Sequence, residues 1–169
     1  MDSWNGLHLR NHLLPGDLGQ VAAMHGRIYA EEHDFAIGFE AYVMECLMEF
    51  YSRYKSDKDG VWVLEDGDRL VGFLALMHRP NQCAQLRFLI LEKRYRGMVI
   101  GKKLMEEWIK FYREKKYKEA YLYTTSGLDP AVGLYKKFGF EKKSEIHSRY
   151  FGMPLLEILF RLNEKKEQN

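Results

Sequence analysis

The chain has 169 residues, enough for one compact domain with a sizeable core, and it is 46% hydrophobic and 30% charged. Its 26 Lys and Arg residues nearly balance 24 Asp and Glu residues, so the formal net charge is only +2. This balance argues against a general nucleic-acid binder, whose affinity usually rests on a basic field. No stretch reaches the ~18 apolar residues of a membrane span and no leader peptide is evident, so we expect a cytoplasmic protein with no membrane partner.

The residues that most often bind metals or form disulfides show no pattern of that kind. Cys46 and Cys83 lie in apolar stretches, without CxxC or Cys/His spacing. The histidines share no ligand spacing either. We therefore expect reduced thiols and no metal site.

Hydrophobic periodicity divides the chain into eleven segments between polar turns. The predicted elements, in chain order, are a strand at 6–14, helices at 18–32 and 39–54, strands at 61–65, 70–78 and 83–91, a helix at 100–116, a strand at 120–124, a helix at 129–137, and strands from 140 onward and at 155–162. Asp17 is expected to cap the first helix. We see no repeat and no linker, so the prediction is one mixed α/β domain over 1–169, with its core at about 6–162 and a polar tail at 163–169.

A loop between a strand and a helix, EKRYRGMVIGKKL at 92–104, has the features of a phosphate site. The first N–H groups of a helix have no internal partner and lie at the positive end of its dipole. Gly97 and Gly101 let the backbone turn and let a ligand come close. The Walker and dinucleotide glycine patterns are both absent. By spacing alone, a phosphate cradle and a surface loop with solvated lysines are equally good interpretations.

A second motif, AVGLYKKFGF at 131–140, decides between them. Together the two stretches resemble the Gcn5-related N-acetyltransferase (GNAT) superfamily, whose loop runs Arg/Gln-x-x-Gly-x-Gly/Ala and whose later helix reads Ala-x-x-Leu-Tyr-x-x-x-Gly-Phe. The loop matches at Arg96 and Gly101, with Val99 in the usual place of a glycine. The helix motif matches at Ala131, Leu134, Tyr135, Gly139 and Phe140. The resemblance implies a mostly antiparallel mixed sheet with a splayed central strand pair and helices on both faces.

Finer features resemble the acetyltransferase domains that some bacteria fuse to MarR-type regulators. They are Gln85-Leu86-Arg87, Thr124-Thr125, Leu128 and Tyr150-Phe151-Gly152. No regulator domain is present in the chain, so the DNA-binding function of the fusions is not carried over.

The resemblance implies acetyl-CoA as co-substrate. Its pantetheine would lie along the splayed strand end, at Leu89, Ile90 and Leu91, and its pyrophosphate over the loop amides. These amides belong to Arg96, Gly97, Met98, Val99, Ile100, Gly101 and Lys102. A valine is tolerable there if its φ is negative and strained if φ is positive. We therefore expect a negative φ at Val99 with its N–H toward the phosphate.

The resemblance also implies Tyr135 as the general acid that protonates the departing thiolate. A general base is harder to place, because Gln85 stands about where many relatives carry a glutamate. Other candidates are Glu32, His33, Glu92 and His78, of which we choose Glu32; a water chain or an amine that arrives neutral is also open. Arg87 shares strand parity with Gln85, Leu89 and Leu91, so Gln85 and Arg87 are predicted to face the acceptor.

The resulting hypothesis is direct acetyl transfer, in a ternary complex, to a primary amine of a small molecule or peptide. Two alternatives come from other classes of protein. A non-catalytic CoA-binding module is favoured by Val99 and Gln85, whereas a nucleotide-phosphate enzyme would need a Walker lysine and a magnesium carboxylate that are not visible. A homodimer formed through LLEILFRL at 155–162 is possible.

Overall fold

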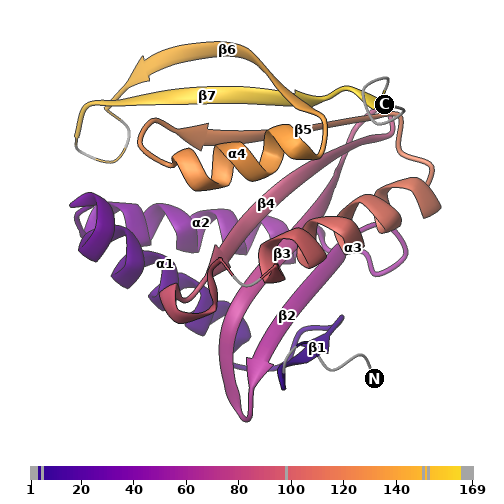
Figure 1. Cartoon of the computed structure of the whole chain (residues 1–169), viewed down its shortest axis with the longest axis horizontal. Coiled ribbons are helices and arrows are strands. Elements are labelled where there is room, and N and C mark those ends of the chain that lie inside the picture. The colour runs from indigo at the N-terminus through magenta and orange to yellow at the C-terminus, as the bar shows by residue number, and fades with distance from the viewer. Residues whose placement is uncertain (1–3, 5, 98, 150, 152, 165–169) are drawn as a thin grey trace.

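A seven-stranded sheet with helices on both faces forms the framework of the chain (Figure 1). The structure is a computed structural model, and it describes residues 4, 6–97, 99–149, 151 and 153–164. The strands are β1 (His8–Arg10), β2 (Gly60–Asp66), β3 (Arg69–Arg79), β4 (Cys83–Leu91), β5 (Glu119–Thr125), β6 (Phe140–Ser148) and β7 (Leu155–Leu162). The helices are α1 (Asp17–His33), α2 (Ile37–Arg53), α3 (Ile100–Glu114) and α4 (Asp129–Lys137), with a 3-10 turn at Lys93–Tyr95. The predicted order of elements and fold class are confirmed.

The sheet divides between its two central strands. The strand order is β1-β2-β3-β4-β5-β7-β6, and every neighbouring pair is antiparallel except β4 and β5. These two parallel strands pair only over Cys83–Gln85 and Glu119–Tyr121. Beyond that point the β5 side of the β4 main chain has no strand partner. The predicted splayed pair is therefore present.

Alternate side chains of the inner strands supply two separate cores. On β2, Trp62 and Leu64 face a cluster that includes Leu104 and Trp108 of α3. Val61 and Val63 face the opposite cluster, which holds the buried residues of α1 and α2. All four β2 residues are 3% exposed or less, because helices cover both faces of the strand.

A bulge at Phe88 reverses the parity of β4. Leu86 packs toward the α3 side of the sheet, whereas Phe88 and Ile90 pack toward the α1 and α2 side. Phe88 has a positive φ of 59°, and the register with β3 shifts at this point. The extra residue turns the following side chains over. The predicted shared parity of Arg87 with Leu89 is therefore wrong.

The first strand and the start of α1 differ from the prediction. β1 is three residues long, whereas a strand was expected over 6–14. Gly16 occupies the N-cap of α1 in a left-handed conformation, with φ 99°, and no side chain caps the helix. Asp17 is therefore not the cap. Its carboxylate instead accepts two hydrogen bonds from Arg10, at 2.8 and 3.0 Å, and one from the Leu14 N–H at 2.6 Å.

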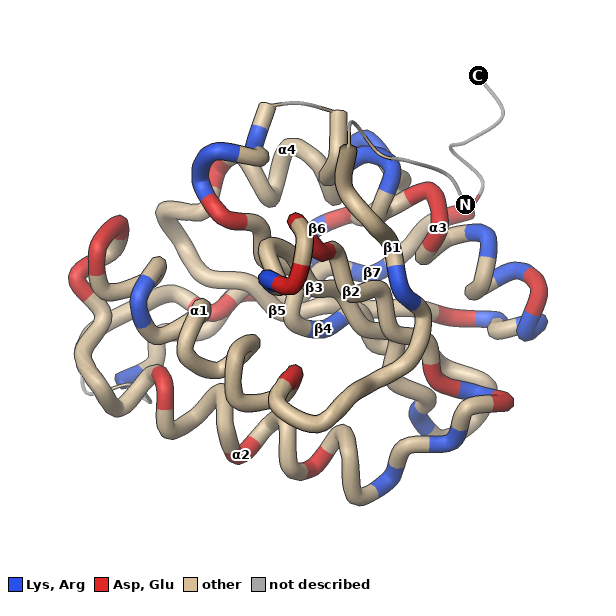
Figure 2. The backbone as a smooth tube through the Cα atoms, turned by 90° about the horizontal axis from the view of Figure 1, so that it is seen from below, with Lys and Arg blue, Asp and Glu red and all other residues tan. Residues whose placement is uncertain are grey.

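Charged residues of both signs are distributed along the whole chain, as Figure 2 shows from below. Basic and acidic segments follow one another on the helices and turns, in keeping with the near-neutral total. Within the described ranges, no helix is long and apolar enough to cross a membrane.

Candidate functional site

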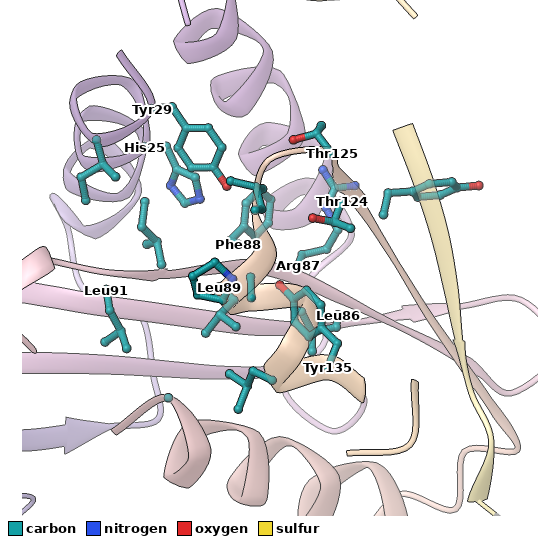
Figure 3. A pocket seen from close by; sticks show the side chains of 18 of the residues that line it. His25, Tyr29, Leu86, Arg87, Phe88, Leu89, Leu91, Thr124, Thr125 and Tyr135 are labelled. Carbon is teal, nitrogen blue, oxygen red and sulfur yellow. The ribbon is translucent and has the colours of Figure 1, made fainter. Parts of the chain in front are cut away.

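A large cavity lies where β4 and β5 separate. Its volume is about 1090 Å³, and α1, α2, β4, β5, α4 and the loop before α3 all contribute to its lining. Figure 3 shows His25 and Tyr29 of α1 on one side, Arg87, Thr124 and Thr125 on the other, and Phe88 between them. The separation of the two strands thus opens directly into a cavity of ligand size.

The loop before α3 turns through two left-handed residues. Gly97 has φ 71° and Val99 has φ 65°. The expected negative φ at Val99 is therefore wrong. Val99 is the N-cap of α3, its carbonyl accepts the Lys103 N–H at 3.0 Å, and its side chain is 60% exposed. The chain must reverse sharply to enter the helix, and at position 99 it does so despite the Cβ branch.

Gly101 leaves a small space between α4 and β4, which a Cβ would fill at ordinary van der Waals contact. It lies in the first turn of α3, and a Cβ at this position would meet Leu134 of α4 at 3.4 Å and Leu91 of β4 at 3.8 Å. Arg96, Gly97, Val99, Gly101 and Lys102 all line the cavity, as do Leu89, Ile90 and Leu91. Ile100 is buried beneath them. Met98 lies outside the described residues, as do Tyr150 and Gly152.

The Arg96 side chain connects this loop to two other elements, although 37% of it is exposed to solvent. Its Nε donates to the Leu91 carbonyl at 2.9 Å, and its Nη1 donates to Oε2 of Glu32 at 2.7 Å. The guanidinium therefore joins three elements: the end of β4, the loop and the end of α1.

Tyr135 of α4 lines the cavity although its side chain is almost fully buried, at 7% exposure. Burial, and next the nearby Tyr29, raise the pKa of the Tyr135 hydroxyl above its ordinary value of 10. The phenol is therefore a proton donor throughout the physiological range. In Figure 3 the Tyr135 side chain lies beside Leu86, below Tyr29 and Phe88 in this view.

Of the four predicted base candidates, two line the cavity and two do not. Glu32 and His33 are on its wall at the end of α1. The hydrogen bond from Arg96 lowers the pKa of Glu32, which makes its carboxylate a weaker proton acceptor. Glu92 is bound to Arg69 at 2.7 Å, and His78 is bound to Asp59 at 2.8 Å.

Gln85 and Arg87, which were predicted to face the acceptor, are both on the cavity wall, but they differ in burial and in hydrogen bonding. Gln85 is buried, and its Oε1 accepts hydrogen bonds from Arg79, at 2.8 and 2.6 Å, and from the Tyr121 hydroxyl at 3.2 Å. Arg87 is half-buried, with its guanidinium 4.9 Å from the centre of the Phe88 ring. Among the described residues, no carboxylate lies within salt-bridge distance of Arg87.

Two further polar groups on the wall were not singled out from the sequence. His25 is 5% exposed and lines the cavity. The sequence does contain a signal for His25. It lies four residues from both Val21 and Tyr29, and this spacing places it on the predicted apolar face of α1. The Oγ1 of Thr125, at the end of β5, is buried and has no hydrogen-bond partner among the described residues. A buried hydroxyl of this kind is usually satisfied, and a bound ligand can supply its partner.

Aromatic rings form the end of the cavity beneath α1 and α2. The ring of Phe151 lies 4.7 Å from Tyr42 and 5.2 Å from Phe39, measured between centroids. Tyr29 stacks on Phe39 at 4.4 Å. This wall is apolar and rigid, so it suits a flat or aliphatic group. Within the described ranges, no group of three His, Cys, Asp or Glu side chains is placed to hold a metal ion.

A family model and a curated relative both match this chain to acetyltransferases. The model of the acetyltransferase (GNAT) family matches residues 27–140. N-acetyltransferase 8B of Rattus norvegicus is 32% identical over 114 residues, which cover 62% of this chain and 51% of that protein. The chain thus spans about half the length of this curated relative.

Solved structures share the fold. A GNAT-family acetyltransferase from Staphylococcus aureus aligns with a TM-score of 0.75 at 19% identity, over 93% of this chain and 98% of that chain. An acetyltransferase from Bacillus anthracis, solved in complex with acetyl coenzyme A, aligns with a TM-score of 0.58 at 19% identity, over 68% of each chain. At these identities the likeness concerns the fold alone.

Proposed function

Since the chain belongs to the GNAT family of acetyltransferases, we propose that it transfers the acetyl group of acetyl-CoA to a primary amine. The observation that carries the proposal is the strand separation itself. The β4 main chain beyond Gln85 loses its β5 partner beside a helix N-terminus, and the cavity that opens there has the Tyr135 phenol on its wall. One continuous site can therefore hold the extended pantetheine arm of acetyl-CoA, its phosphates and its thioester.

The proposed binding site for acetyl-CoA follows from the stretch of β4 main chain that has no β5 partner among the described residues. The pantetheine would hydrogen-bond to the open edge of β4 at Leu89–Leu91, in the manner of an added strand. The pyrophosphate would bind the amides at the start of α3, between Arg96 and Lys102, where the helix dipole favours an anion. Gly101 leaves space for this approach between Leu134 and Leu91. Thr125 offers a hydroxyl that a polar ligand atom would satisfy.

The proposed reaction is direct transfer. The lone pair of a neutral amine attacks the acetyl carbonyl carbon, the carbon–nitrogen bond forms, and the carbon–sulfur bond then breaks. The thiolate that leaves takes the proton of the Tyr135 hydroxyl, which burial keeps protonated. Glu32 stays a candidate for the proton that the amine gives up, although its bond to Arg96 weakens it.

The acceptor is proposed to lie on the α1 and α2 side of the sheet. Gln85 is fixed there by Arg79 and Tyr121, so its amide is held in one orientation. Arg87 presents a cation without a carboxylate partner among the described residues, and an anionic group on the acceptor would pair with it. The kinship with regulator-fused bacterial domains, the cytoplasmic location and a homodimer stay predictions.

The direct test is release of free CoA thiol from acetyl-CoA upon addition of amines. The panel contains a small aliphatic amine, free amino acids, an aminoglycoside and a peptide with a free N-terminus. We expect turnover with at least one amine, and a kcat about 10²–10⁴-fold lower in Tyr135→Phe with little change in acetyl-CoA affinity. Unaltered turnover in Tyr135→Phe would remove the phenol from the mechanism. Acetyl-CoA binding without turnover by the wild type would instead favour a non-catalytic CoA-binding module.

A further inference from the structure

The acceptor amine must lose a proton during transfer, and three of the four residues predicted for that task are bound to other side chains. Glu32 is bonded to Arg96 at 2.7 Å, and His78 to Asp59 at 2.8 Å. Gln85 is an amide and cannot take a proton. A different group on the cavity wall, His25, has a nitrogen available for this role.

The tautomer of His25 is fixed by its own helix. Its Nδ1 lies 2.8 Å from the carbonyl oxygen of Val21, one turn earlier on α1. A carbonyl oxygen only accepts, so Nδ1 carries the hydrogen and Nε2 of the neutral ring carries a lone pair. No described residue forms a hydrogen bond with Nε2.

The ring is held where the transfer would occur. His25 stacks on Tyr29, with centroids 6.0 Å apart and planes 19° from parallel. Its other neighbour is the bulged residue Phe88, at 6.2 Å in an edge-to-face arrangement. The bulge lies on β4 between Arg87 on the acceptor side and Leu89 at the proposed pantetheine edge. The imidazole thus borders both halves of the proposed ternary complex.

We propose that Nε2 of His25 is the general base that receives the proton of the acceptor amine. This inference rests on the proposed acetyltransferase function. When the amine nitrogen bonds to the acetyl carbon it becomes positively charged, and one of its protons passes to Nε2. The hydrogen bond from Nδ1–H to the Val21 carbonyl stabilises the resulting imidazolium, as the third member of a catalytic relay does. The proton that Tyr135 gives to sulfur is later replaced through solvent, which balances the cycle.

The surroundings of His25 keep it neutral before the reaction. Burial lowers its pKa to about 4, and the positive Arg87 on β4 acts in the same direction. Helices α1 and α2 also bring the titratable residues Tyr29, Glu32, His33, Tyr42 and Cys46 to the cavity wall. Burial raises the pKa of the Tyr29 and Tyr42 phenols. At neutral pH, Nε2 is therefore unprotonated. The same shift makes Nε2 a weak base. Proton transfer to it therefore depends on the acidity that the amine nitrogen gains when it bonds to the acetyl carbon.

Chemical rescue separates a proton acceptor from a packing residue. In His25→Ala, measured with the panel amine that gives the highest wild-type turnover, we expect kcat to fall about 10²–10³-fold while acetyl-CoA affinity is kept. Added imidazole should restore turnover in a concentration-dependent manner, because it can enter the space that the ring leaves. His12→Ala, which changes an exposed histidine outside the cavity, is the control and should show neither the loss of kcat nor a response to imidazole.

A second variant guards against a folding defect. His25→Asn retains an N–H that can reach the Val21 carbonyl but has no atom at the Nε2 position, so it should fold normally and share the loss of kcat. Wild-type kcat in His25→Asn overturns the base assignment and leaves the acetyltransferase proposal intact. Loss in His25→Ala without imidazole rescue also overturns it, because the ring then only packs. Absence of turnover by the wild type with every amine overturns both proposals.

Discussion

At the scale of single residues, Val99 combines a β-branched side chain with a left-handed backbone conformation that such side chains rarely adopt. A β-branched residue is held at φ 65°, where left-handed geometry brings Cβ too close to the following carbonyl. Val99 is 60% exposed, so packing of its side chain offsets little of the free-energy cost of this backbone strain. Because Val99 begins α3 beside the proposed pyrophosphate site, the loop keeps a strained turn where a glycine would be relaxed.

We predict that Val99→Gly stabilises the protein. The substitution should remove about 1–2 kcal/mol of left-handed strain, and the greater freedom of glycine in the unfolded chain will offset part of that gain. Urea unfolding should therefore show a small net increase in the free energy of unfolding. Val132→Gly, within helix α4, is the matched control and should lose about 0.5–1 kcal/mol. A loss of stability in Val99→Gly would mean that the side chain makes a contribution that its exposure does not reveal.

Residue positions were predictable where a motif names a side chain, and not where the position depends on backbone rotation. The position of Tyr135 on the cavity wall was expected. The sign of φ at Val99 was not, because it depends on how the whole loop closes onto α3. His25 was overlooked for another reason: its helix face is visible in the sequence, but the cavity facing it opens where β4 and β5 separate, which no single segment of the sequence indicates.

At the scale of elements, a buried ionic cluster attaches the short strand β1 to helix α1 and strand β2. Arg10 is 7% exposed and bonds to Asp17, which is 4% exposed, and to Glu65 at 2.6 Å. These bonds join residues that are 7 and 55 positions apart. The cluster fixes the start of α1, and therefore the helix that presents His25, Tyr29 and Glu32 to the cavity.

We predict that Arg10→Met destabilises the protein by about 3 kcal/mol, because it leaves the buried Asp17 carboxylate without its cation. Arg53→Met is the matched control. Arg53 pairs with Glu49 at 3.5 Å on the surface of α2, and its loss should cost less than about 0.5 kcal/mol. Denaturant unfolding of both variants at pH 7 checks this, and equal effects would contradict the account.

The difference in stability between the wild type and Arg10→Met should depend on pH. The hydrogen bond from Arg10 lowers the pKa of Glu65 below its usual 4.5 in the folded protein. A depressed folded pKa contributes stability above the unfolded pKa, and that contribution is lost as the pH falls through the folded value. The stability difference between wild type and Arg10→Met should therefore narrow below about pH 4.5. A constant difference down to pH 3 would argue against a charged Glu65 partner.

The order of elements was predictable from periodicity, whereas local irregularities were not. Helices α1 to α4 and the inner strands follow their hydrophobic patterns closely. The extra residue at Phe88 carries no composition signal, and it moved Leu89 and Leu91 to the opposite face from Arg87. The alternation over 6–14 was overridden because Arg10 turns inward to Asp17 and Glu65, which limits β1 to three residues.

At the scale of the whole molecule, the two cores hold the sheet open. One packs under α3 and α4 and includes residues of both β4 and β5, whereas the other packs under α1 and α2 and includes Ile90 of β4 but no residue of β5. The two strands separate beyond their short paired stretch. The open edge persists because each strand is paired on its far side, β4 with β3 and β5 with β7. A ligand that binds this edge adds contacts to the folded state alone, and so acts on the stability of the entire domain.

Calorimetric titration of acetyl-CoA into the wild-type protein and into Gly101→Leu tests the central claim most directly. The account predicts saturable binding at one site in the wild type, and much weaker binding in the variant, whose side chain would project between Leu134 and Leu91. At 100 times the Kd, acetyl-CoA should also stabilise the wild type by about 2.7 kcal/mol, raising Tm by roughly 5–10 °C. No saturable heat with the wild type, or equal binding by a folded Gly101→Leu, would contradict the account.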